Sequence, residues 1–520
     1  MSMQNNWKPY HTYDTALVIN FGGQYAHLIA RRIRELKVYS EIVHYSDFSE
    51  RTLYEIKPKA IILSGSPLSA PDLDHSKLKP ILSGKIPVLG ICYGHQLLAY
   101  MLGGTITKGP GEYGKTLVKI VKKDKLFENW NQEEVVWMSH QDRVEVLPET
   151  LEVLAISENN IIAAFKVKNK PIYGVQFHPE VSHTPKGLLL LRNFLYTIAK
   201  CRAFWIPQQI LERLIEEIRA KVSSEEKVLC AVSGGVDSTV TATLVQKAIG
   251  DRLIAVFVDH GLLREGEVET TLSLLKKLNI NYIFVDAKER FLSRLKGIKD
   301  PEEKRKIIGE EFARIFKEIV EKDPSIKWLA QGTIYPDVIE SGKIKHSARI
   351  KSHHNVAGLP KWFNLKLIEP LRYFYKDEVR KIAKALGLPD YLVKKHPFPG
   401  PGLAVRIIGE VNEKKLEIVR KASKIVEEEL RKSGFYDKVW QAFAVVGDDK
   451  WVGVKGDKRA EGYIVTIRIV ESVDGMTADF TKLPYSILEK IASRICNEVD
   501  DVTMVTYAIT PKPPSTIEPC

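Results

Sequence analysis

Long apolar runs are missing from this sequence of 520 residues, and cysteine is scarce in it. No run approaches the roughly 18 apolar residues that a membrane-spanning helix needs. Residues 1–14 lack the charged and then apolar order of a secretory signal. The five cysteines are scattered, odd in number and without a Cys-x-x-Cys pair, which argues against a zinc site or a disulfide framework. We therefore expect a cytoplasmic protein with no membrane contact.

Lysine and arginine outnumber the acidic residues, 77 to 65, and give a formal net charge of +12. Such a charge favours anionic partners, and nucleic acid is one class of these. Basic patches interleaved with aromatic residues are absent from the sequence, which favours a lysine-rich solvated surface over a nucleic-acid interface. A basic cleft for phosphorylated small molecules also agrees with the charge. We expect no nucleic-acid partner.

The order of apolar and amphipathic segments predicts the fold class α/β. At roughly 100–200 residues per domain, the length predicts about three domains. Short apolar runs alternate with segments of helical spacing such as 25–36, as is typical of an open, mainly parallel α/β sheet. The strands that we expect in this pattern are 16–20, 60–63, 87–91, 172–177, 228–232, 253–259, 282–286 and 328–331.

Two changes of composition divide the chain. A helix ends near Lys200, and a Trp-Ile-Pro segment then leads into a new helix over 208–220, so we place a joint at residues 201–207. Beyond residue 396 a Pro- and Gly-rich stretch precedes a charged helix at 413–432 and further strand-like runs. The predicted domains are two open, mainly parallel α/β domains and a smaller α+β domain, over residues 1–203, 204–395 and 396–520.

Cys92 lies where an apolar strand turns into a helix, and Gly90 and Gly94 flank it. Such a sharp turn exposes the side chain between them, and the glycines relieve the crowding. The helix that starts at the thiol favours its thiolate form through the helix dipole and the free N–H groups. The pattern on its own fits a nucleophile or a buried structural cysteine equally well.

A second strand end carries His178, Pro179 and Glu180. Residues i and i+2 of an extended segment point the same way, so Glu180 would lie beside His178; it could also reach the histidine through a turn of its own backbone. In either case a base and the carboxylate that orients it arise together, as nucleophilic catalysis requires. This pair favours the nucleophile interpretation of Cys92.

These two motifs resemble the class I glutamine amidotransferases over roughly residues 15–200. The resemblance implies that a thiolate attacks the side-chain amide of glutamine, with Cys92 as nucleophile, His178 as base and Glu180 as orienting carboxylate. It also implies an oxyanion hole and a glutamine pocket formed by Gly65, Tyr93, Gln96, Ser139 and His140. Ser66 stands where that family usually has a second glycine.

The string SGGVDS at 233–238 follows a strand directly and opens a helix. A Gly-rich turn of this kind presents N–H groups to phosphate oxygens at the helix N-terminus. Asp237 supplies a carboxylate that could hold Mg²⁺ on those phosphates. The residues that we expect to bind the phosphates of ATP are Ser233, Gly234, Gly235, Val236, Asp237, Ser238 and Thr239.

This string is not the Gly-x₄-Gly-Lys-Ser/Thr loop of kinases and GTPases. It resembles the pyrophosphate loop of the N-type ATP pyrophosphatases, which cleave ATP between the α and β phosphates. The resemblance implies that a substrate oxygen is adenylated, that pyrophosphate leaves, and that a nucleophile then displaces AMP. Mg²⁺ is the cofactor that it implies, with ATP as co-substrate.

The fusion of these two parts, in this order, resembles the glutamine-hydrolysing GMP synthases over nearly the whole chain. The strings VDHGLLR at 258–264, QGTIYPD at 331–337, HPFPGPGLAVR at 396–406 and KPPSTIE at 512–518 agree with this family. It implies glutamine, ATP and xanthosine 5′-monophosphate (XMP) as substrates. The implied ATP contacts are completed by Val258 and Gly332, and the implied XMP contacts are Arg264, Lys512, Thr516 and Glu518.

The family resemblance also implies a homodimer formed through residues 396–520 and a mobile lid at residues 351–360. The chain departs from the family at Pro519 and Cys520, where the usual ending is Trp-Glu.

Two other functions remain open from the sequence. One is another amidating or sulfur-transferring ligase such as a tRNA thiolase, although that chemistry usually needs a reactive cysteine pair. The other is a regulatory protein whose two sites are relics, although both motifs are complete.

Overall fold

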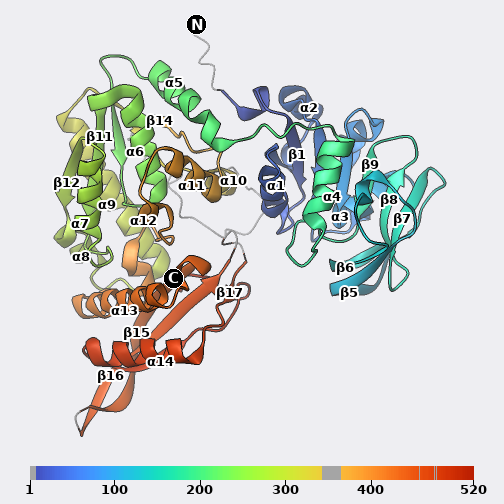
Figure 1. The fold of residues 1–520 in the computed structure, drawn as a ribbon. Coiled ribbons are helices and arrows are strands. Elements are labelled where there is room, and N and C mark those ends of the chain that lie inside the picture. Colours follow the sequence, from blue (N-terminus) through green and yellow to red (C-terminus); the bar gives the residue numbers. More distant parts are fainter. Residues whose placement is uncertain (1–6, 342–364, 456, 473–474, 476) are drawn as a thin grey trace. The chain divides into compact units, whose positions relative to one another are not determined.

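The computed structural model describes residues 7–341, 365–455, 457–472, 475 and 477–520. The chain divides into two compact units, Met1–Ile206 and Pro207–Cys520 (Figure 1), and each is described by itself. Residues 351–360, where the sequence predicts a lid, lie outside the described residues.

The first unit is built on one nine-stranded sheet, of which one half is parallel. Its parallel strands, in the order β2-β1-β3-β4-β9, are β2 (Tyr39–His44), β1 (Thr15–Asn20), β3 (Ala60–Leu63), β4 (Val88–Ile91) and β9 (Ile172–Val175). Strands β3, β4 and β9 are buried at every position, as is typical of parallel strands covered on both faces. The expected apolar strands are confirmed here.

The other half of this sheet is antiparallel, and the sequence analysis did not include it. It continues from β9 through β8 (Ile162–Val167), β7 (Leu151–Ser157), β5 (Thr105–Ile120) and β6 (Glu133–Val146). Buried and exposed positions alternate along much of β5, because only one of its faces is covered. The long strand β6, which contacts α3, carries two of the predicted site residues, Ser139 and His140.

Three helices cover the parallel half of the first unit: α1 (Ala26–Glu35), α3 (Tyr93–Met101) and α4 (Gly187–Arg192). Helix α1 packs on β1 and β2, and α3 packs on β4 and β9. A short helix, α2 (Glu50–Ile56), precedes β3. The expected helix over 25–36 is confirmed as α1.

The predicted joint is anchored to the first unit over most of its length. The Trp205 side chain is 1% exposed, and its ring lies 4.8 Å from the ring of Tyr39 and 5.2 Å from that of Tyr13. Its backbone N–H donates to the carbonyl of Lys37 at 2.9 Å. Arg202 forms two side-chain hydrogen bonds, each 3.0 Å long, to the carboxylate of Asp14. The division between the units therefore comes after Trp205.

The second unit begins with a five-stranded, fully parallel sheet. The order β12-β11-β10-β13-β14 places β10 (Lys227–Ala231) in the middle, between β11 (Leu253–Asp259) and β13 (Ile326–Ala330). The edge strands are β12 (Tyr282–Asp286) and β14 (Lys366–Ile368). The four strands expected from the sequence are confirmed, and β14 is an addition. Helix α5 (Leu211–Lys221) precedes these strands. Between and after them lie α6 (Val236–Ile249), α7 (Glu267–Lys277), α8 (Lys288–Leu295), α9 (Pro301–Lys322), α10 (Tyr335–Ser341), α11 (Lys376–Ala385) and α12 (Asp390–Val393).

The remainder of the second unit is a small sheet covered by two helices (Figure 1). The hairpin of β15 (Gln441–Lys455) and β16 (Lys458–Glu471) is extended by β17 (Asp479–Phe480) on one side, and β18 (Val502–Tyr507) runs parallel to β16. The helices are α13 (Glu413–Lys432) and α14 (Tyr485–Glu498). The apolar core of this sheet continues into the parallel sheet, from Ile467 through Val419 and Leu403 to Leu229. A third domain from residue 396 stays a prediction.

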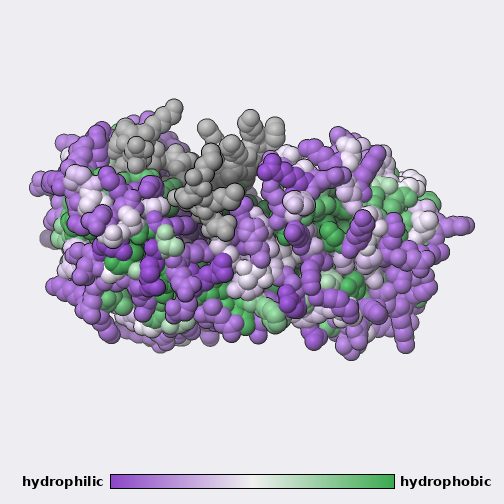
Figure 2. Space-filling view, turned by 90° about the horizontal axis from the view of Figure 1, so that it is seen from above, coloured by the Kyte–Doolittle hydropathy of each residue, from purple (hydrophilic) through white to green (hydrophobic). Residues whose placement is uncertain are grey.

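On the face shown in Figure 2, hydrophilic residues cover most of the area and hydrophobic residues are scattered between them. Within the described part of the chain, none of the helices is both long enough and apolar enough to cross a membrane.

Candidate active sites

Cys92 occupies a strained turn between β4 and α3. Its backbone has φ 54° and ψ −103°, a conformation that costs an ordinary residue about 1–3 kcal/mol. The turn is tight because a Cβ on Gly90 would lie 2.3 Å from the carbonyl oxygen of Gly94, and one on Gly94 would lie 2.5 Å from that of Leu63. The turn therefore needs both glycines, and it places the sulfur at the N-terminus of α3.

His178 and Glu180 form a buried pair beside this sulfur. The Nδ1 atom of His178 lies 2.7 Å from Oε1 of Glu180, whose side chain is fully buried. Burial disfavours the imidazolium, but the Glu180 carboxylate and a hydrogen bond with the Cys92 sulfur raise the pKa of His178 above its usual range. The arrangement can hold a thiolate against an imidazolium.

Backbone bonds fix the position of the histidine. Its N–H donates to the carbonyl of Trp137 at 3.0 Å, and its carbonyl accepts from Oγ1 of Thr184 at 2.7 Å. The ring of Tyr25 meets the imidazole edge-on, with 5.0 Å between the ring centres. The base is therefore held from three sides before any substrate binds.

The structure brings Gly65, Tyr93 and Ser139 to the same place. Gly65 follows β3, which pairs with β4, and a Cβ on it would lie 3.7 Å from Cε1 of His178. Tyr93 is the first residue of α3, so its N–H is at the helix end where such groups are free to bind an anion. The carbonyl oxygen of Ser139 lies 3.6 Å from the Cys92 sulfur. Backbone N–H groups such as those of Gly65 and Tyr93 are the donors that an oxyanion hole needs, whereas the Ser139 carbonyl can only accept. The roles of all three residues stay predictions.

Gln96 and His140 have protein partners instead of facing open space. The amide nitrogen of Gln96 donates to the carbonyl of Asp142 at 2.6 Å and to Oε1 of Gln176 at 3.2 Å. The ring of His140 lies 2.9 Å from the same carbonyl through Nδ1 and 3.1 Å from Glu112 through Nε2. Their place in a glutamine pocket stays a prediction. Gln176 was missed by the sequence analysis, although it precedes His178 by two residues in one extended segment.

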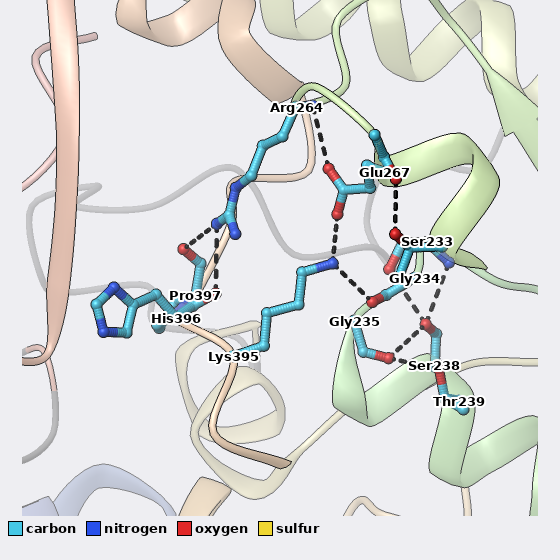
Figure 3. A network of polar contacts seen from close by, with 12 residues as sticks. Ser233, Gly234, Gly235, Ser238, Thr239, Arg264, Glu267, Lys395, His396 and Pro397 are labelled. Atoms are coloured by element: carbon cyan, nitrogen blue, oxygen red, sulfur yellow. Dashed lines mark hydrogen bonds and ion pairs between the residues drawn. The ribbon is translucent and has the colours of Figure 1, made fainter. Parts of the chain in front are cut away.

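The second site is the loop between β10 and α6, drawn in Figure 3. The hydroxyl of Ser238 accepts from the N–H of Ser233 at 3.1 Å and donates to the carbonyl of Gly235 at 3.2 Å. Oγ1 of Thr239 donates to the same carbonyl at 2.8 Å. Gly234 has φ +72°, and a Cβ on it would lie 2.5 Å from Oγ1 of Thr271. The loop is thus pre-formed around its own hydroxyls, at the N-terminus of a 14-residue helix that starts at Val236.

Asp237 has one occupied and one open carboxylate oxygen. Oδ2 pairs with the amine of Lys376, the first residue of α11, at 2.5 Å. Oδ1 is buried and has no hydrogen-bond partner among the described residues. A carboxylate oxygen of this kind suits a hard cation. The described residues include no cluster of three or more His, Cys, Asp or Glu side chains that could hold a metal alone.

The other predicted ATP contacts lie at neighbouring strand ends. Gly332 follows β13, and a Cβ on it would lie 3.0 Å from the backbone nitrogen of Ser238. Val258 is the next-to-last residue of β11, which pairs with β10 in parallel. Both therefore lie beside the loop, at the edge of the sheet where ligands of parallel α/β folds bind.

A basic cavity of about 310 Å³ adjoins this loop. Lys395 reaches it from the chain after α12, and its amine contacts the Glu267 carboxylate at 2.5 Å and the Gly234 carbonyl at 3.0 Å (Figure 3). Arg264 donates to the carbonyls of His396 at 3.4 Å and Pro397 at 3.2 Å. The charged side chains that line the cavity are Arg264, Lys395, Arg406, Arg420, Lys424, Arg431, Glu265, Glu267, Glu427 and Glu428. The sequence analysis missed Lys376, which comes from α11, and Lys395, which comes from the chain after α12.

Glu518 is held by Arg406, which lines this cavity. The guanidinium of Arg406 is 1% exposed and donates to the two carboxylate oxygens at 3.1 and 2.9 Å. Nε2 of Gln441 donates to Oε1 at 2.6 Å. Because a carboxylate offers about four acceptor positions, the three donors found among the described residues leave room for a ligand. Glu518 and Arg264 are thus both tied to the cavity lining.

Lys512 and Thr516 have backbone partners. The Lys512 amine donates to the carbonyl of Gly475 at 2.8 Å. Thr516 donates through Oγ1 to the Glu518 carbonyl at 2.5 Å, and its own carbonyl accepts from Arg468 at 3.2 Å. Their contact with a nucleotide stays a prediction.

Known protein families match segments of both units. Residues 17–198 match the family described as glutamine amidotransferase class-I, residues 209–319 match NAD synthase, and residues 428–519 match the GMP synthase C terminal domain. A glutaminase fold joined to an α/β nucleotide-binding fold defines the class of amidotransferase ligases.

The curated relatives identify the family within this class. A GMP synthase [glutamine-hydrolyzing] of Pyrobaculum aerophilum is 61% identical over 98% of this chain and 100% of its own length. The enzyme of the same name from Caldanaerobacter subterraneus is 53% identical over 97% and 99%, and that from Carboxydothermus hydrogenoformans is 52% identical over 96% and 99%. The chain belongs to the family of glutamine-hydrolysing GMP synthases.

Proposed function

We propose that this protein converts XMP to GMP, with glutamine as nitrogen donor and with ATP cleaved to AMP and pyrophosphate. The observation that carries the proposal is that one chain contains both a Cys92–His178–Glu180 constellation and a pre-formed SGGVDS loop. The first can release ammonia and the second can hold the pyrophosphate of ATP.

In the glutaminase reaction Cys92 and His178 act in successive steps, and Glu180 supports His178. The Cys92 thiolate attacks the side-chain carbonyl carbon of glutamine, and the oxyanion meets the N–H groups at Tyr93 and Gly65. His178 gives its proton to the departing ammonia, which leaves a glutamyl thioester. The neutral imidazole then takes a proton from water, whose oxygen attacks the thioester and releases glutamate and the thiolate. Glu180 stabilises the imidazolium at each stage.

The synthetase reaction uses the loop and the basic cavity. The XMP oxygen attacks the α-phosphorus of ATP, and the departing pyrophosphate is bound by the N–H groups of the loop and by Ser233 and Ser238. Asp237 would hold Mg²⁺, which when bound would neutralise part of the phosphate charge. Ammonia then attacks the activated carbon, AMP leaves with the oxygen, and GMP forms. Arg264 and Glu518 would hold the XMP.

Product analysis tests this proposal directly. The protein is incubated with ATP, Mg²⁺, glutamine and XMP, and the nucleotides are separated by chromatography. Equal amounts of GMP, AMP and pyrophosphate are expected. AMP and pyrophosphate that appear only with another acceptor would retain the ligase class and reject XMP as substrate. No AMP with any acceptor would reject the role of the loop.

Replacement of Glu518 by glutamine is expected to raise the KM for XMP about 10- to 100-fold. The variant loses the charge-assisted hydrogen bonds from Arg406, which are worth about 1.5–3 kcal/mol. Steady-state kinetics with ammonium as nitrogen donor measure this effect without the glutaminase site. The matched control is Glu489→Gln at an exposed position of α14. Equal KM values in the two variants would contradict a role for Glu518 in XMP binding.

We also infer that the protein is a homodimer formed through the β15–β16 hairpin. Val452 and Val454, 50 and 75% exposed, share one face of β15, and Trp451, 52% exposed, lies on the other, so both faces of the hairpin carry exposed apolar side chains. A two-fold axis would cover such a patch with the same patch of a second copy. Sedimentation at micromolar concentration is expected to give twice the 59.0 kDa mass of the chain. Trp451→Glu should shift it to the monomer, whereas Tyr54→Glu in the first unit should not.

A further inference from the structure

Gln176 is a fully buried amide that contacts the nucleophile. It follows β9 directly, and the N–H of Cys92 donates to the carbonyl of its neighbour Val175 at 2.9 Å, which fixes the two segments side by side. Its Nε2 atom lies 3.8 Å from the Cys92 sulfur, within the range of an N–H donor to sulfur. The Cys92 sulfur therefore contacts the amide of Gln176 as well as the imidazole of His178.

The orientation of this amide is determined by its neighbours. The carbonyl of Asp142 can only accept, so the group of Gln96 that lies 2.6 Å from it must be the amide nitrogen. The second N–H of that nitrogen donates to Gln176 at 3.2 Å, so Gln176 presents its oxygen there. The nitrogen of Gln176 must then face the sulfur.

A buried network holds the Asp142 carbonyl in turn. His140 contacts it at 2.9 Å, and Glu112 contacts the other side of the His140 ring at 3.1 Å. Glu112 also accepts from Ser157 at 2.7 Å and from Asn159 at 2.8 Å. The network therefore runs without a break from Glu112 to the Cys92 sulfur.

We propose that Gln176 is a further catalytic residue, whose amide N–H stabilises the Cys92 thiolate, and that Gln96 and His140 are positioning residues for it. The proposal rests on the proposed glutaminase function. His178 gives up its proton when ammonia leaves, whereas an amide keeps its N–H throughout. Gln176 can therefore stabilise the sulfur both before the attack and when the sulfur leaves the thioester.

The test is the pH dependence of Cys92 alkylation by iodoacetamide in the full chain, read by mass spectrometry of the Cys92 peptide. Gln176→Leu is expected to shift the half-maximal rate upward by about one pH unit. Gln176→Glu, which is nearly isosteric, should shift it further because a carboxylate repels the thiolate. The titratable groups that face the sulfur, His178, Glu180 and Tyr25, are unchanged in both variants.

Activity measurements separate this proposal from the function itself. Glutamine-dependent synthesis should fall about 10- to 100-fold in Gln176→Leu, while ammonium-dependent synthesis stays unchanged. The control is Gln132→Leu, an exposed position of the same unit. If the pH dependence of Cys92 alkylation in both Gln176 variants coincides with that of the parent protein, the proposal is overturned. A parent protein that hydrolyses no glutamine would instead overturn the proposed function.

Discussion

With alanine at position 92, glutamine-dependent GMP formation is expected to fall by at least about a thousandfold, whereas synthesis from added ammonium continues. The sulfur is the atom that would attack the amide, and neither His178 nor Glu180 can replace it. The second unit keeps its loop and its cavity in this variant, so ammonia supplied from solution can still react. GMP formation with each nitrogen source measures the two routes separately.

Cys201→Ala is the matched control for this substitution. Cys201 lies in the same unit and is buried, and burial raises the pKa of its thiol to about 12, so it remains protonated. Both routes should keep their parental rates in this control. Loss of ammonium-dependent synthesis in Cys92→Ala would contradict the separation of the two reactions.

Asp237→Ala is expected to reduce both routes together by about 100- to 10,000-fold. A metal ion that neutralises phosphate charge contributes several kcal/mol to the transition state, and each 1.4 kcal/mol is tenfold in rate. The variant loses the open oxygen that would hold this ion, and Lys376 loses its partner at 2.5 Å. Rates with glutamine and with ammonium, each at several Mg²⁺ concentrations, measure the effect.

Asp251→Asn is the control for Asp237, because it follows the same helix in an exposed position. It should leave both rates unchanged. If Asp237→Ala lost GMP synthesis from glutamine but kept normal synthesis from ammonium, a role of Asp237 in ATP cleavage would be contradicted. Unfolding midpoints of the two variants show whether the loss reflects the site or the stability of the unit.

Most of the parallel strands were predictable because they are buried on both faces and so appear as continuous apolar runs, but the edge strands β2 and β14 were not among the predicted strands. The antiparallel strands β5 and β6 were not, because one face of each is exposed and polar residues interrupt the pattern. The pairing of β5 with β6 could only be seen once the chain was folded.

The residues of the two sites also fall into a group that the sequence predicts and a group that it does not. Cys92, His178 and the SGGVDS loop follow strand ends, where a short motif defines both the local turn and the chemistry. The partners of these groups come from far along the chain, since Lys376 pairs with a residue 139 positions away and Arg406 with one 112 positions away. No local pattern in the sequence specifies such contacts, because the fold alone brings the two segments together.

The glycines at 90 and 94 have a consequence for the evolution of this turn. The nearest atom that a side chain would meet at each position is a backbone oxygen, which belongs to the helix that follows for Gly90 and to β3 for Gly94. A second substitution in a neighbouring side chain therefore cannot make room for the first. A lineage that ceased to use glutamine could lose Cys92 in one step, but it could not replace either glycine without disturbing the junction of β4 and α3. The pair of glycines should therefore outlast the nucleophile, and mark descendants that have kept the fold and lost the reaction.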